Sequence, residues 1–151
     1  ILRRIDMIAI GCDHGGFEHK NAIAEHLIER GFEVVDCGIY ENKSVDYPDI
    51  AVKVCEQITN GNCERGILVC GTDIGMSLAA NKVNGIRAAA CSEHFSAKYT
   101  RLHNDSNILA MGARVVGSEL ASAEIEKGTF NPASFARLTI CNLSISFSNC
   151  P

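Results

Sequence analysis

Short apolar stretches alternate with longer helical segments along most of this chain, and this alternation constrains its fold more than any other feature. Strands are predicted over residues 7–12, 32–37, 66–69, 87–91 and 107–111. Helices are predicted over residues 17–30, 49–59, from the glycine-rich turn at 71–75 to about 83, 92–102 and 118–127. Because parallel strands need long crossover connections, helices between the strands predict a parallel sheet in a three-layer α/β sandwich.

Single residues mark some of these boundaries. Gly31 stands just after the first predicted helix, where glycine commonly ends a helix. Ser92 is expected to cap the helix that reaches Leu102. Between the second strand and the second helix, residues 38–48 are expected to form a loop.

Composition excludes several classes of partner. With 151 residues and a hydrophobic fraction of 46%, the chain suits one domain with a substantial core. A net charge of −4 without a basic stripe argues against nucleic acid and anionic membranes as partners. No apolar run approaches the roughly 20 residues that span a bilayer, and no signal-peptide core is visible, so a cytoplasmic protein is expected. We expect one domain over residues 7–151, with residues 1–6 being a cloning remnant or a short native extension.

The chain is rich in cysteine, but the spacing does not suit a structural metal. Its eight cysteines stand at positions 12, 37, 55, 63, 70, 91, 141 and 150, and no C-x-x-C pair occurs. Paired spacing is typical of structural zinc sites, so zinc is not expected. Several of these cysteines occupy apolar strand positions, and reduced thiols are therefore predicted.

Cys70 is the strongest candidate for chemistry. It follows the apolar run 66–69 and precedes a turn over 71–75 that leads into a helix. Glycines in such a turn let backbone N–H groups converge, and a helix N-terminus adds partial positive charge. An oxyanion or phosphate could therefore be held beside the sulfur. The alternative is that Cys70 is one more small buried residue that ends a core strand.

Other polar residues stand near the ends of predicted elements, and ligands of open parallel sheets bind at the carboxyl ends of the strands. Asp13 and His14 follow the first strand on a glycine turn, where they could orient or protonate a ligand hydroxyl or only cap the turn. His103, with Asn104 and Asp105, closes the fourth helix, and proton transfer and helix capping are both open for it.

Tyr47 and Arg114 are further candidates with ordinary alternatives. Tyr47 lies in the long loop and could contact a ligand or only pack over the edge of the sheet. Arg114 follows the last predicted strand, where it could reach an anion or stay solvated.

Six segments together resemble, in order along the chain, motifs of the ribose-5-phosphate isomerase B and galactose-6-phosphate isomerase family of aldose–ketose isomerases. They are Gly11–Phe17, Val45–Asp49, Cys70–Lys82, Ser92–Glu93, Arg101–Asn107 and Gly112–Gly117. The resemblance extends over about residues 7–127. It implies a Rossmann-like three-layer αβα sandwich with a parallel sheet, no metal and no cofactor. It also implies a homodimer with shared active sites, and leaves open whether dimers pair into tetramers.

The resemblance implies roles for several residues. Cys70, as a thiolate, would remove the proton from C2 of an open-chain sugar phosphate and give a cis-enediolate. His103 would open the furanose ring by donating a proton to the ring oxygen, with Asp13 assisting through the sugar hydroxyls. Thr72 and the Gly71–Gly75 backbone would stabilise the enediolate oxygen.

The same resemblance implies the residues that bind the substrate. His14, Arg114 and Arg137 would hold its phosphate. The complete set is Asp13, His14, Tyr47, Gly71, Thr72, Asp73, Ile74, Gly75, Asn104, Arg114 and Arg137.

The chain departs from the family pattern at two places. Asp73 stands where the family has glycine, and we expect its carboxylate to point away from the pocket, because its charge would oppose a neighbouring enediolate. The tail over residues 129–151 lacks an arginine-rich final helix, and Arg137 is the arginine available there. Met76 stands where another branch of the family carries a glutamate base, which leaves Cys70 as the base.

The predicted function is the interconversion of ribose 5-phosphate and ribulose 5-phosphate, a step of the non-oxidative branch of the pentose phosphate pathway. One alternative is an isomerase of a six-carbon sugar phosphate, such as galactose 6-phosphate or allose 6-phosphate. Another is a catalytically silent module that binds sugar phosphates. A thiol-redox role is disfavoured, since Cys70 has no resolving cysteine close to it in the sequence.

Overall fold

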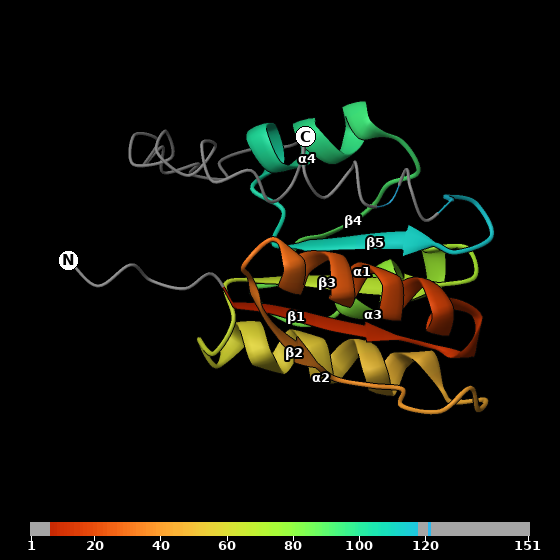
Figure 1. Cartoon of the computed structure of the whole chain (residues 1–151). Helices are drawn as coiled ribbons and strands as arrows, with labels where there is room; N and C mark the ends of the chain where they lie inside the picture. Colours follow the sequence, from red (N-terminus) through yellow and green to blue (C-terminus); the bar gives the residue numbers. More distant parts are fainter. Residues whose placement is uncertain (1–6, 118–120, 122–151) are drawn as a thin grey trace, which may run out of the picture.

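The computed structural model describes residues 7–117 and residue 121, which form a parallel sheet with helices on both faces (Figure 1). The strands are β1 (Met7–Cys12), β2 (Glu33–Asp36), β3 (Arg65–Cys70), β4 (Ala88–Ala90) and β5 (Ile108–Gly112). Their order in the sheet is β2-β1-β3-β5-β4, and every neighbouring pair is parallel. The predicted parallel α/β fold is therefore confirmed.

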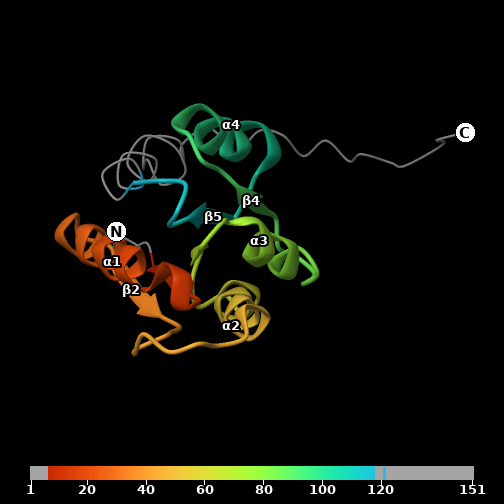
Figure 2. The same ribbon diagram turned by 90° about the vertical axis from the view of Figure 1, so that its right-hand side faces the viewer.

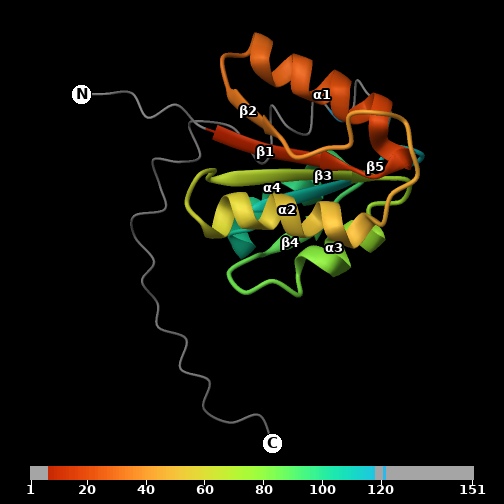
Figure 3. The same cartoon turned by 90° about the horizontal axis from the view of Figure 1, so that it is seen from below.

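The helices form the outer layers of the sandwich. They are α1 (Phe17–Glu29), α2 (Tyr47–Thr59), α3 (Ile74–Ala80) and α4 (His94–Asn104), and a single 3₁₀ turn, η1 (His14–Gly16), precedes α1. Seen along the sheet, α1 lies on one side and α2 and α3 on the other (Figure 2). Figure 3 shows α2 and α3 next to each other on the face opposite α1. Helix α4 lies beside β4 and β5, at the end of the sheet opposite β2 (Figures 1 and 2).

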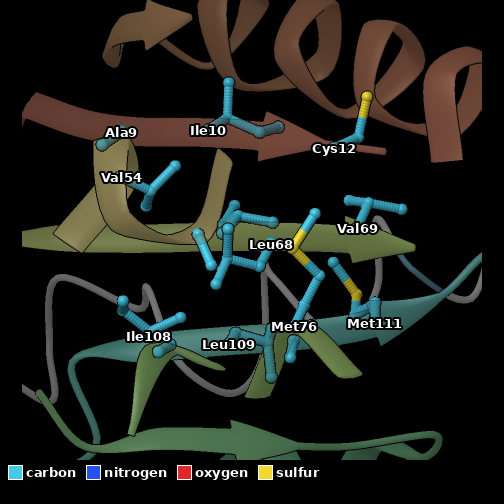
Figure 4. Packing of buried hydrophobic residues seen from close by; sticks show 14 of the residues in the cluster. Ala9, Ile10, Cys12, Val54, Leu68, Val69, Met76, Ile108, Leu109 and Met111 are labelled. Atoms are coloured by element: carbon cyan, nitrogen blue, oxygen red, sulfur yellow. The ribbon is translucent and has the colours of Figure 1, made fainter. Parts of the chain in front are cut away.

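Apolar side chains from the three central strands form the core (Figure 4). Ile10 of β1, Leu68 of β3 and Leu109 of β5 have no exposed surface. Val54 of α2 and Met76 of α3 are equally buried among them. All six residues of β3 are buried, because this strand has a neighbour on each side and helices above and below. Met76, which stands where another branch of the family has a glutamate, is thus a core residue.

Several helix boundaries differ from the predictions, including the end of α4, which lies at Asn104 instead of Leu102. Helix α2 begins at Tyr47, because Pro48 fits the first turn of a helix, where its missing N–H has no intrahelical partner to lose. Helix α3 ends at Ala80 instead of near Val83. Asn81 explains the early end, since its side-chain amide bonds the carbonyl oxygens of Ser77 and Ala88 and accepts a hydrogen bond from the Ala88 N–H. These bonds tie the end of α3 to the first residue of β4.

The predicted cap of α4 was wrong by one residue. Glu93, not Ser92, is the N-cap, and its carboxylate accepts hydrogen bonds from the backbone N–H groups of Phe95 and Ser96. A carboxylate reaches two donors at once and interacts favourably with the helix N-terminus, which explains why it displaces the serine. The predicted helix over 118–127 and the tail over 129–151 lie outside the described residues, as do residues 1–6.

The cysteines within the described range form no disulfide, in agreement with the predicted reduced thiols. Burial raises the pKa of Cys12, Cys37 and Cys55 to about 11 in each case. These three side chains are therefore uncharged at neutral pH and cannot act as thiolate bases. Within the same range, no helix combines the length and the apolar character needed to cross a bilayer.

Candidate active site

A cavity of about 230 Å³ opens where β1 and β3 end at the carboxyl edge of the sheet. Strands β1 and β3 are neighbours, but their next connections lead to opposite sides of the sheet, so the cavity lies at the topological switch point. The lining residues come from four separate stretches of chain. They are Asp13, His14, Gly15, Tyr47, Cys70, Gly71, Thr72, Gly75 and Arg114.

The turn after β1 forms one wall. Asp13 caps η1 by accepting a hydrogen bond from the Gly15 N–H at 2.8 Å, and its own N–H donates to the Val69 carbonyl. A Cβ at Gly16 would stand 2.7 Å from the Val69 carbonyl oxygen, so only glycine allows this approach of the turn to β3. The turn is thereby held against the end of β3, with Asp13 and His14 beside the cavity.

Cys70 is the last residue of β3 and is 5% exposed. Its sulfur accepts a hydrogen bond from the backbone N–H of Asp73 at 3.1 Å. The sulfur therefore combines burial, an amide donor and access to the cavity.

Asp73 adopts the left-handed conformation, with φ of 67°, that the family's glycine would allow. Aspartate tolerates this region better than most residues, which explains how the backbone accepts the substitution. The residue is absent from the cavity lining, consistent with the expected direction of its carboxylate, but it is not turned out to solvent, being 8% exposed. Burial raises the pKa of this carboxyl above its ordinary value.

Arg114 forms another part of the cavity wall. The backbone N–H groups of Ala113 and Arg114 donate to the carbonyls of Cys70 and Gly71, at 2.7 and 3.1 Å. The guanidinium group passes so close to Gly71 that a Cβ there would stand 3.6 Å from Nε. A cationic side chain is therefore held against the backbone of the Cys70 turn, where it can attract an anionic group of a ligand.

Tyr47 closes the side of the cavity next to α3. Its ring would lie 3.2 Å from a Cβ at Gly75, so the absence of a side chain at Gly75 gives the ring room to lie over the helix start. Tyr47 is the first residue of α2 and is 42% exposed. The ring is thus placed over the cavity without being locked into the core.

The structure does not bring every predicted site residue to this cavity. His103 and Asn104 end α4, and the Asn104 carbonyl accepts a hydrogen bond from Arg87, which precedes β4. Both residues therefore lie at the amino edge of the sheet, whereas the cavity lies at the carboxyl edge. Ile74 does not line the cavity and is 57% exposed. Arg137 lies outside the described residues.

His103 has different neighbours from those that the sequence suggested. The Asp105 carboxylate pairs with Arg101 instead of orienting the imidazole. The ring of Tyr99, one helical turn earlier, packs at a tilted angle against His103 with ring centroids 4.9 Å apart, and Phe95 packs against Tyr99 in turn. An aromatic row along α4 thus ends in an exposed imidazole.

A second cavity, of about 280 Å³, lies beside the loop after β2. Its walls include Cys37, Ile39, Val45 and Ile50. None of the predicted site residues lines it, and its wall is mainly apolar. The smaller cavity at the switch point is therefore the candidate active site.

Comparison with known proteins identifies relatives of this chain. A family model described as Ribose/Galactose Isomerase matches residues 8–136. Ribose-5-phosphate isomerase B of Escherichia coli is 51% identical over 119 residues, covering 79% of this chain and 80% of the relative. D-erythrulose-4-phosphate isomerase of Pectobacterium atrosepticum is 46% identical over 116 residues, covering 76% of each.

The solved structure of Clostridium thermocellum ribose-5-phosphate isomerase B superposes with a TM-score of 0.79 at 48% identity, covering 87% of this chain and 91% of that one. The chain belongs to the Ribose/Galactose Isomerase family. The resemblance inferred from its motifs is confirmed, and so are the Rossmann-like fold and the assignment as an isomerase.

Sequence reasoning missed two residues near the site. Gly15 lines the cavity, and its signal was its place in a glycine pair directly after Asp13 and His14. His19, in the first turn of α1, bonds the chain beyond Arg114. No pattern in the sequence links two residues so far apart.

Proposed function

We propose that this protein interconverts ribose 5-phosphate and ribulose 5-phosphate. The observation that carries the proposal is that Cys70 lines the same cavity as the Asp13–His14 turn and Arg114. The name of the Escherichia coli relative, at 51% identity, supports this substrate. A cytoplasmic enzyme of pentose phosphate metabolism is the corresponding cellular prediction.

In the proposed reaction, the Cys70 thiolate takes the proton from C2 of the open-chain aldose. The electrons of that C–H bond form the C1–C2 double bond of a cis-enediolate, and the carbonyl electrons move to O1. The hydroxyl proton on O2 is transferred to O1, the double bond collapses to a C2 carbonyl, and the cysteine returns its proton to C1. Backbone N–H groups of the Gly71–Gly75 turn and the Thr72 hydroxyl stabilise the oxygen that carries the charge.

Arg114 and His14 are the proposed ligands of the substrate phosphate. Both line the cavity and are exposed to it, on walls formed by the loops after β5 and β1. Arginine binds phosphate through parallel hydrogen bonds, which fixes the sugar chain in one direction. Asp13 and Tyr47, which lie on the same rim, are suited to contact the sugar hydroxyls.

We further propose a homodimer in which His103 and Asn104 of one copy complete the cavity of the other. The distance between the two edges of the sheet supports this arrangement, because His103 cannot serve the cavity of its own chain from the amino edge. Exposed apolar side chains on α3 and α4 support a contact between copies. They are Ile74, Leu78 and Phe95, at 57%, 61% and 66% exposed.

The test is ketose formation from ribose 5-phosphate by the wild type and by Cys70→Ala. Loss of the base should reduce kcat by about 10²–10⁴-fold with little change in Tm, because general base catalysis typically contributes that much. Cys37→Ala is the matched control, since this thiol lines the other cavity and should leave the rate unchanged. Wild-type activity that survives in Cys70→Ala would refute the assignment of the base, and an inactive wild type would refute the substrate.

A further inference from the structure

We infer that His19 is a positioning residue for phosphate binding, because it anchors the far end of the loop that carries Arg114. We call residues 113–117 the Arg114 loop. The inference rests on the proposed function, in which Arg114 binds the substrate phosphate. His19 lies outside the cavity lining and acts through the loop.

The anchor is a hydrogen bond between α1 and the loop. His19 Nε2 lies 3.0 Å from the carbonyl oxygen of Val116, 97 residues later in the chain. A carbonyl oxygen can only accept, so the ring carries a proton on Nε2 and donates it. The bond therefore joins the first turn of α1 directly to the backbone of the loop.

The Arg114 loop is attached at both ends. At its start, the N–H groups of Ala113 and Arg114 donate to the turn that holds Cys70. At its end, Val115 and Val116 both donate to the Gly112 carbonyl, which folds the chain back on itself at 2.9 and 2.8 Å. His19 then holds the carbonyl of Val116 from outside the loop. Arg114 therefore stands between one anchor on β3 and another on α1.

Loss of the second anchor has a defined consequence for the loop. Val116 is 1% exposed, and His19 is the donor to its carbonyl among the residues that the structure describes, so replacing His19 removes a hydrogen bond in a largely buried position. Losing a hydrogen bond to a buried carbonyl costs free energy, which the loop can recover by moving toward solvent. That movement would shift Arg114, whereas Cys70 is held within β3 by its own ladder bonds to neighbouring strands.

His19 also couples the two walls that would hold the phosphate. It lies in the first turn of α1, which begins directly after the η1 turn containing His14. The bond to Val116 therefore fixes the Arg114 loop relative to the segment that carries His14. Because both side chains must face one phosphate group, their relative position matters for binding more than the position of either alone.

The test compares His19→Leu and His19→Gln with the wild type. Leucine fills similar space without a donor, whereas the glutamine amide nitrogen can stand where Nε2 stands and donate to Val116. Asn21→Leu, on the exposed side of the same helix, controls for an added leucine on α1. The dissociation constant for inorganic phosphate is measured by calorimetry, and KM and kcat are measured for ribose 5-phosphate and for D-ribose, which has no phosphate.

We expect His19→Leu to weaken phosphate binding and raise KM for ribose 5-phosphate by about fivefold, the size of one typical hydrogen bond. The kcat for ribose 5-phosphate and the kcat/KM for D-ribose should stay near the wild-type values. His19→Gln should restore phosphate binding, and Asn21→Leu should not alter it.

Three results would overturn the inference: unchanged phosphate affinity in His19→Leu, equal losses for the phosphorylated and unphosphorylated sugars, or a glutamine variant as weak as the leucine variant. Failure of the proposed function would give a different set of results. In that case the wild type does not isomerise ribose 5-phosphate, while the phosphate dissociation constants still report whether His19 positions Arg114.

Discussion

The carboxyl edge of the sheet and helix α4 both carry predicted catalytic residues, but they are held in opposite ways. At the carboxyl edge, the turns after β1, β3 and β5 are joined by backbone hydrogen bonds and by glycines that leave no space for a side chain. In α4, Ala97 is the buried residue of the helix, and Phe95 and Leu102 are well exposed. The proposed site residues at the carboxyl edge are thus fixed within a single chain, whereas those of α4 are exposed on its surface.

This difference has a physical reason. A base and an enediolate-binding turn must keep fixed geometry relative to each other, and a strand end inside a core provides it. A ring-opening acid must act on the same substrate from another direction, and α4 cannot reach that position within its own chain. An exposed helix that packs against a second copy would meet this requirement, so the lack of burial on α4 is itself an argument for the shared site.

The largest expected effect comes from removing the imidazole that α4 exposes at its C-terminal end. His103→Ala should lower the rate on ribose 5-phosphate by about 10²–10⁴-fold, the usual contribution of a general acid. An aldotetrose 4-phosphate has no free hydroxyl at C4 to close a furanose ring, so it needs no ring opening. The rate on erythrose 4-phosphate should therefore change far less, and equal losses on both sugars would remove His103 from the ring-opening step.

Mixing two inactive variants tests whether the halves come from different copies. Cys70→Ala and His103→Ala are unfolded together, refolded at equal concentrations and assayed on ribose 5-phosphate. In a symmetric dimer with shared sites, random pairing makes half of the dimers mixed, and each has one intact site, so about a quarter of wild-type activity should return. A mixture that pairs but stays inactive would contradict the shared site.

The close packing at the carboxyl edge of the sheet can be tested at Gly112, the glycine that ends β5. A Cβ at Gly112 would stand 2.9 Å from the backbone of Thr72, so Gly112→Ala forces β5 and the Cys70 turn apart. Such overpacking should lower the free energy of unfolding by about 1–3 kcal/mol, with a parallel loss of activity. Gly117→Ala is the control, because no described atom lies within 4 Å of its Cβ position, and its unfolding curve should match that of the wild type.

The smallest expected effect concerns the buried carboxyl at the start of α3. Burial raises the pKa of Asp73 in the folded state, so its stabilising contribution is complete below the ordinary pKa of about 3.9 and is lost as pH rises through the raised value. Asp73→Asn removes this loss and keeps a residue that tolerates the left-handed conformation. The difference in Tm between Asp73→Asn and the wild type should therefore increase slightly, in favour of the variant, from pH 4 to pH 7.

Asp105→Asn provides the contrast for that measurement. Asp105 also has a positive φ, of 53°, but it is exposed and pairs with Arg101. Its substitution removes an ion pair instead of relieving burial, so no gain in Tm with rising pH is expected. A flat or declining difference for Asp73→Asn would mean that burial does not disfavour the charge of Asp73.

Much of the fold followed from local patterns in the sequence. The five strands were predicted to within one residue at each end, because runs such as residues 66–69 are apolar and bounded by turn residues. The errors arose from side-chain hydrogen bonds that these patterns do not show. Asn81 ends α3 early by bonding β4, and Glu93 displaces Ser92 because its longer side chain reaches two donors.

The candidate site likewise contains residues that the sequence could place and residues that it could not. Asp13, Cys70 and Arg114 each follow a strand, and the rule that strand ends of a parallel sheet face one edge was enough to bring them together. His103 belongs to no strand end, so the same rule could not show that it lies at the opposite edge. His19 acts through a contact with residue 116, which no local pattern encodes.

The amino-acid sequence by itself determined the class of fold, the family and the identity of the candidate base. Periodicity and turn residues are local properties, and six ordered motifs are specific to one family. Only the tertiary structure decided the strand order, the position of α4 at the other edge and the bond from His19 to Val116. These features depend on which distant segments pack together, and that is decided by the free energy of the whole core and not by any stretch of the chain.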